Sequence, residues 1–123
     1  MSNDRTIAGE LCGHAAKIIM TERGNQHGSA EDSFEMIGEF WSTYLKYKIF
    51  MATGQKFDPK INAFDVAQMM SMLKKARALM GNANNRDHYV DDIGYTALGG
   101  MMMMPDKPRA PEGYQGDNAD GEQ

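Results

Sequence analysis

Two aspartates late in the chain, Asp87 and Asp91, stand four residues apart in the stretch RDHYVDDIGYTAL. In a helix this spacing places both carboxylates on one face. Two carboxylates so placed suit a hard cation such as Mg²⁺, which prefers oxygen ligands and keeps several waters. The alternative is that they are acids of a first helical turn, where negative charge complements the helix dipole. In either interpretation we expect the adjacent Asp92 to be exposed.

Lys74 and Arg77 form a comparable pair of cations, three residues apart. An ammonium and a planar guanidinium on one helix face suit phosphate oxygens. The alternative is a surface pair near a helix C-terminus, where cations are favoured. Arg23 and His27 flank the glycine-containing turn RGNQHG, where backbone N–H groups can approach a phosphate. A hydrogen-bonded turn histidine is the alternative for His27.

Further candidate ligands stand on neighbouring segments. Asp32 and Glu35 form a D-x-x-E pair, and one of them could complete a metal site with the two aspartates above. A solvated acidic helix face is the alternative. Tyr95 lies one turn beyond Asp91 and either orients a ligand or closes the packing of its helix.

Four predicted helices must position these side chains. Apolar residues recur at helical spacing in the segments 4–22, 30–52, 63–80 and 87–102. No alternating pattern typical of strands occurs. The sequence therefore predicts an all-α protein, built as a small antiparallel four-helix bundle.

Two of these helices carry unusual residues. The apolar positions of the 30–52 helix wrap more than half of its surface, which predicts a central helix or one shared with another subunit. Together with the methionine run 101–104, they exceed what four short helices bury alone, so we expect a homo-oligomer. The last helix contains Gly94, Gly99 and Gly100. These glycines either permit close packing or end the helix near residue 98.

Length and composition define the class of protein. A chain of 123 residues favours one domain, here a helical domain over 1–104 followed by a disordered acidic tail over 105–123. The net charge of −4 provides no basic surface for duplex nucleic acid. A single cysteine, Cys12, excludes an intrachain disulfide and fits a reducing cytosol, and we assign no catalytic nucleophile. No apolar run approaches the ~20 residues that span a bilayer.

Three segments together resemble a family of small phage and prophage proteins of unassigned function. They are RGNQHGSAEDSFEMIGEFW, DVAQMMSMLKKARAL and DHYVDDIGYTAL, which span residues 23–98. The resemblance rests on the order and spacing of these motifs. It implies a protein that acts in the cytoplasm of the host cell.

The same motifs more distantly resemble the MazG-like all-α nucleotide pyrophosphohydrolases. Those proteins are usually oligomeric and use Mg²⁺, held by acids on two helices, to cleave nucleoside triphosphates to monophosphate and pyrophosphate. The positions that match their relatives are His27 with Gly28, Lys74 with Arg77, and Asp87, Asp91 and Tyr95. The acidic pattern departs from the E-x-x-E and E-x-x-D pairs of MazG-like enzymes. This chain offers Asp32-x-x-Glu35 and then a pair with a four-residue interval.

Three functions follow from these patterns. The first is a Mg²⁺-dependent nucleotide pyrophosphohydrolase-like protein, with Asp87, Asp91 and Glu35 or Asp32 as metal ligands. The second is a non-catalytic binder of a nucleotide or nucleotide-derived signal, acting as a phage accessory or counter-defence protein. The third is a structural or interaction protein.

Overall fold

The structure, a computed structural model, describes residues 4–22 and 30–104. Arg23 and His27 of the predicted phosphate-binding turn, and the predicted tail over 105–123, lie outside the described residues. The elements are α1 (Arg5–Lys17), the π-helical turn η1 (Ile18–Glu22), α3 (Ala30–Thr53), α4 (Ala63–Met80) and α5 (Arg86–Met103).

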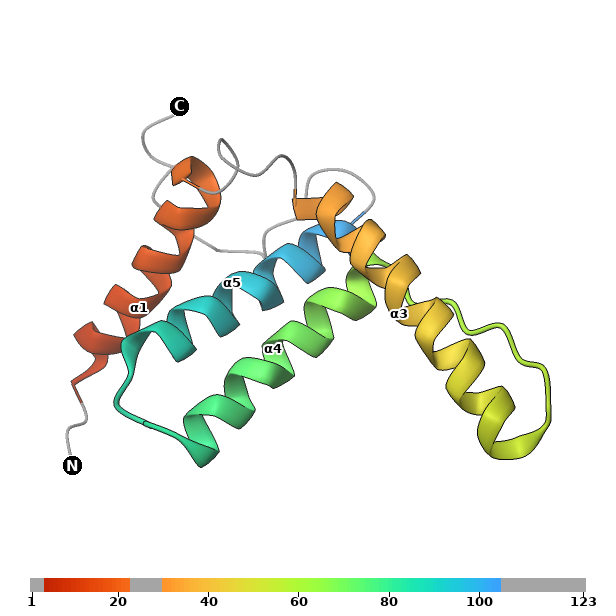
Figure 1. Cartoon of the computed structure of the whole chain (residues 1–123). Coiled ribbons are helices and arrows are strands. Elements are labelled where there is room, and N and C mark those ends of the chain that lie inside the picture. Colours follow the sequence, from red (N-terminus) through yellow and green to blue (C-terminus); the bar gives the residue numbers. More distant parts are fainter. Residues whose placement is uncertain (1–3, 23–29, 105–123) are drawn as a thin grey trace.

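All elements in the described residues are helical, which confirms the all-α class (Figure 1). The helices predicted over 30–52, 63–80 and 87–102 begin and end within one residue of the expected positions. In the segment predicted as one helix over 4–22, the α-helix ends at Lys17 and η1 continues it to Glu22. The antiparallel bundle of four helices and its MazG-like character stay predictions.

Side-chain caps fix the first residues of three helices. The Asp4 carboxylate caps α1 by accepting the Thr6 N–H at 2.9 Å. Asn62 and Asp65 form a reciprocal capping box at the start of α4, with N···O distances of 2.9 and 3.0 Å. The Asn85 side chain caps α5. Because such caps satisfy N–H groups that a helix cannot pair internally, they set where each helix begins.

The closest helix pair is α4 with α5, which lie side by side and are joined by the turn 81–85 (Figure 1). Gly99 of α5 is buried, and a Cβ there would stand 3.2 Å from the Ala67 Cβ of α4. The glycine thus lets the two backbones approach. Helix α5 continues to Met103, so its glycines do not end it near residue 98. The other interpretation, that a glycine permits close packing, holds at Gly99.

The core lies where α3, α4 and α5 meet. It is formed by Phe34, Val66 and Ala67, and half-buried side chains pack against it: Ile37, Trp41, Ile61, Ala63, Met70, Tyr95 and Met102. The rings of Phe34 and Tyr95 join α3 to α5, with centroids 6.0 Å apart and planes tilted by 43°. Such a tilted aromatic pair adds to the energy of apolar burial.

Helix α3 joins this core through its first half, and its second half projects from the other helices as an arm (Figure 1). The chain then returns toward α4 through residues 54–62. Gly38 is buried where this return segment meets α3, and a Cβ there would overlap the Ile61 carbonyl oxygen. The Ile61 N–H donates to the Ser42 hydroxyl at 2.8 Å, and that hydroxyl donates to the Gly38 carbonyl at 2.7 Å. We call these three residues the α3 latch.

Helix α1 packs across α5 (Figure 1). Ala15 of α1 is buried, whereas Cys12 is exposed. Among the helices of the described segments, none has both the length and the apolar character needed to cross a membrane.

Candidate functional site

The structure brings together two residues that the sequence placed in different roles. Lys74, predicted to bind phosphate, extends from α4, and its Nζ lies 2.9 Å from Oδ2 of Asp91, a predicted metal ligand on α5. The two side chains are only 16% and 15% exposed. Lys74 is therefore not a surface cation, and Asp91 is not a solvated acid. Charges this far from water need such partners, because an unpaired buried charge is costly.

Arg77 and Asp87 extend the same edge of the helix pair. Arg77 follows Lys74 by three residues and Asp87 precedes Asp91 by four, so each shares a helix face with its partner. Both are exposed. Asp87 lies in the first turn of α5, and its N–H donates to the Asn85 side chain at 3.0 Å. The interpretation that the Asp87 carboxylate complements the helix dipole requires this location in the first turn.

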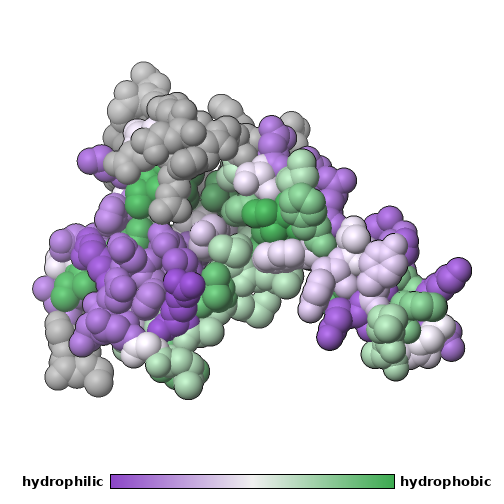
Figure 2. Space-filling view, in the orientation of Figure 1, coloured by the Kyte–Doolittle hydropathy of each residue, from purple (hydrophilic) through white to green (hydrophobic). Residues whose placement is uncertain are grey.

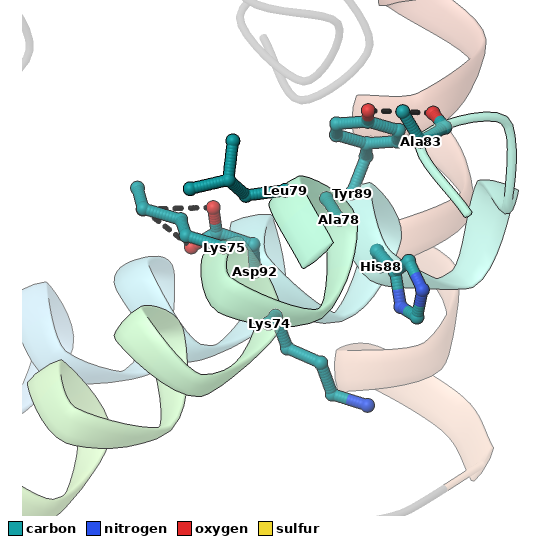
Figure 3. Close-up of a pocket in the computed structure, with 8 residues that line it drawn as sticks. All are labelled: Lys74, Lys75, Ala78, Leu79, Ala83, His88, Tyr89 and Asp92. Atoms are coloured by element: carbon teal, nitrogen blue, oxygen red, sulfur yellow. Dashed lines mark hydrogen bonds and ion pairs between the residues drawn. The ribbon is translucent and has the colours of Figure 1, made fainter. Parts of the chain in front are cut away.

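A second ion pair corrects the expectation that Asp92 is exposed. The Asp92 side chain is 20% exposed, and the Lys75 ammonium contacts its two oxygens at 3.0 and 2.8 Å. The buried Ser71 hydroxyl donates to the same carboxylate and accepts from Lys75 at 2.9 Å. Figure 3 shows Lys75 and Asp92 on one side of the helix pair and Lys74 on the other. Asp92 therefore joins α4 to α5.

The surroundings of Asp92 lower its pKa below the ordinary value of 3.8. Burial raises the pKa, but the hydrogen bonds from Lys75 and Ser71 and the charge of Lys75 together outweigh that effect. A carboxyl whose pKa is lower in the folded chain stabilises the fold above the unfolded value. This contribution is lost as the pH falls through the folded value.

We therefore expect Asp92→Asn to lower the free energy of unfolding near neutral pH. We also expect the variant to lose less stability than the wild type when the pH falls below about 4. Urea unfolding over a pH series measures both effects. Asp58→Asn is the control, because Asp58 belongs to an exposed pair with Lys60 and such pairs contribute little. An Asp92→Asn profile parallel to the wild-type profile would contradict this role of Asp92.

The predicted third metal ligands lie on α3. Asp32 and Glu35 are exposed residues of its first half. In the described segments, no three acidic, histidine or cysteine side chains are grouped closely enough to hold a metal ion. A metal site built from Asp32 or Glu35 with Asp87 and Asp91 stays a prediction.

Tyr95 was expected either to orient a ligand or to close helix packing. Its ring is half-buried beside Phe34 in the core, which is the location that the packing interpretation requires.

A hollow of about 390 Å³ lies between the C-terminal half of α4 and the first turns of α5. Its lining combines charged and aromatic side chains with small apolar ones: Lys74, Lys75, Ala78, Leu79, Ala83, His88, Tyr89 and Asp92. Figure 3 shows His88 on the same side of the helix pair as Lys74. The Nδ1 atom of His88 is buried and makes no hydrogen bond within the described structure. Sequence reasoning did not single out His88, although it directly follows Asp87.

Comparison with known proteins gives a family but no biochemical activity. Over 99 residues the chain is 34% identical to the Gene 55 protein of Mycobacterium phage L5. The match covers 80% of this chain and 56% of that relative, so the chain spans little more than half of the relative's length. No solved structure matches the chain. Residues 10–103 match the family DUF6378, described as a domain of unknown function. The predicted kinship with phage proteins of unassigned function is thus confirmed at this level, and the chain belongs to the DUF6378 family.

Proposed function

We propose that this chain is a phage protein that binds a Mg²⁺-complexed nucleotide at the ion pair between Lys74 and Asp91. The observation that carries the proposal is the 2.9 Å contact between these two largely buried side chains. It puts an ammonium suited to phosphate and a carboxylate suited to Mg²⁺ at one place, on two different helices. The phage origin is inferred from the mycobacteriophage relative.

The donor set fits a cation that arrives with its nucleotide. Mg²⁺ is usually bound by one or two carboxylates together with substrate phosphates and waters, so a cage made only of protein side chains is not required. Asp91 is the carboxylate that would contact the cation, and Asp87 lies one turn away on the same helix face. When bound, the cation would offset phosphate charge and polarise a phosphoryl oxygen.

The ion pair is suited to exchange its partners. Lys74 carries a compact charge on a flexible stem, and it can turn from the Asp91 carboxylate to a phosphate oxygen without leaving its helix face. The exposed Arg77 stands one turn away on that face. The adjacent hollow of about 390 Å³ lies within the usual size range for small-molecule sites. His88, whose buried Nδ1 makes no hydrogen bond within the described structure, also lines this hollow.

Calorimetric titration with a panel of nucleotides, with and without Mg²⁺, tests the proposal. We expect binding that requires Mg²⁺ and weakens about tenfold or more in Lys74→Met and in Asp91→Asn, because each loses a charge-assisted contact. Lys56→Met is the control, since it removes an exposed lysine of the return segment that is absent from the ion pair and from the lining of the hollow. Binding that survives both substitutions, or no binding of any nucleotide in the panel, would rule the proposal out.

The same panel separates hydrolysis from sequestration. The MazG-like resemblance implies cleavage of a nucleoside triphosphate to monophosphate and pyrophosphate. Pyrophosphate release that needs Mg²⁺ and stops in Asp91→Asn supports an enzyme with a MazG-like bundle. Binding without turnover supports a non-catalytic nucleotide binder acting in the host cytoplasm.

A further inference from the structure

Helix α3 carries a row of exposed apolar and aromatic side chains that begins in its first half and runs along the projecting arm. They follow one another at intervals of four, four, three and four residues and are between 53% and 79% exposed: Met36, Phe40, Tyr44, Tyr47 and Met51. At about 100° per residue these positions fall within an arc of roughly 80°. We call this row the α3 stripe.

The stripe is separate from the face of α3 that enters the core. Phe34, Ile37 and Trp41 are the α3 side chains of the core cluster. Toward the far end of the arm, apolar residues form a visible patch among polar ones (Figure 2). An apolar row of this length on a projecting helix is typical of an interaction surface.

Charge along α3 indicates what covers the stripe. Asp32, Glu35 and Glu39 stand in its first half, whereas its second half holds Lys46 and Lys48 and no acid. A second α3 laid antiparallel sets the acidic half of each helix against the basic half of the other. A parallel arrangement would set like charges together, which is unfavourable.

We propose that the α3 stripe binds the α3 stripe of a second copy of this chain, antiparallel and about a twofold axis. Such an interface is self-complementary, because each copy offers the same surface. With the axis at the middle of the stripe, Phe40 of each copy stands opposite Tyr47 of the other, and Met36 stands opposite Met51.

A groove beside the stripe provides the polar margin that interfaces usually have. It has a volume of about 730 Å³ between α3 and the return segment, and Glu39, Lys46 and Tyr47 of α3 contribute to its lining together with residues 58–62. Charged side chains that flank the stripe of the second copy can enter this groove. The stripe shares no residue with the Lys74–Asp91 pair, so dimerisation and nucleotide binding can fail independently.

Sedimentation of the full chain at micromolar concentration tests for the dimer. We expect a dimer for the wild type and a dissociation constant raised about a hundredfold or more in Phe40→Glu/Tyr47→Glu. Met72→Glu is the matched control, because Met72 is 58% exposed on α4, and it should remain a dimer. Circular dichroism verifies that each variant is folded. A monomeric wild type, or a dimer unaffected by the double substitution, overturns the proposal.

Disulfide trapping tests the direction of pairing. Phe40→Cys and Tyr47→Cys are each prepared with Cys12→Ser, which removes the native thiol. We expect disulfide-linked dimers when the two variants are mixed and few when either is oxidised alone. Efficient self-linkage of each separate variant would reveal a parallel pair and overturn the antiparallel arrangement.

Discussion

Gly38→Ala should lower the free energy of unfolding by about 2 kcal/mol or more, although alanine is the better helix former by about 1 kcal/mol. The added Cβ would overlap the Ile61 carbonyl oxygen, which belongs to backbone and cannot rotate away. The α3 latch holds that backbone, since the Ile61 N–H donates to Ser42 at 2.8 Å. Relief of the overlap therefore requires α3 and the return segment to separate. Urea unfolding monitored by circular dichroism measures the change.

Gly94→Ala is the matched control for Gly38→Ala. Gly94 is also a helical glycine, but a Cβ there would meet no atom within 4 Å. This substitution should raise the free energy of unfolding by up to about 1 kcal/mol, because it gains helix propensity without a clash. Equal changes in the free energy of unfolding at the two positions would contradict this account. They would show that the close approach of the Ile61 carbonyl oxygen to Gly38 does not determine the cost of Gly38→Ala.

Asp91→Leu should lower the free energy of unfolding by about 3 kcal/mol, because it leaves the Lys74 ammonium largely buried without this carboxylate. Lys74→Met together with Asp91→Leu should restore most of that loss, since an apolar pair of similar size can replace a buried ion pair at little cost. Unfolding of both single variants and of the double variant in urea completes a double-mutant cycle. We expect a coupling energy of about 2 kcal/mol.

A second cycle at Lys60 and Asp58 calibrates the first. These side chains also form an ion pair, with an N···O distance of 3.1 Å, but they are 82% and 64% exposed. Their coupling energy should be at most about 1 kcal/mol, because water screens the pair. If the two cycles give the same coupling energy, burial does not strengthen the ion pair between Lys74 and Asp91.

The positions of the helices could be predicted from the sequence because their signals are local. Helical periodicity gives the length of each helix, and cap residues such as Asn62 and Asn85 fix the first turns. The arrangement of α3 could not be predicted in the same way. Its broad apolar surface predicted either a central helix or one shared with another subunit. Only part of that surface enters the core, and the α3 stripe is exposed.

The candidate site was predictable by residue type and not by pairing. Lys74 and Asp91 were both singled out, yet as ligands for different groups rather than as partners of each other. Each stands beside a residue of the same type, Lys75 or Asp92. A rotation of one helix by one residue, about 100°, would exchange the partners. The rotation depends on packing at contacts such as Gly99 against Ala67, which no local pattern specifies.

The exposed thiol of Cys12 makes the molecule well suited to site-directed labelling. Cys12 is the only cysteine of the chain, so a maleimide-linked fluorophore or spin label attaches at one defined position without prior mutagenesis. The label lies on α1, whereas the α3 stripe lies on α3 and the ion pairs join α4 to α5. In a twofold dimer the two labels, one on each copy, give a single label-to-label distance. A monomer carries one label and gives no such distance.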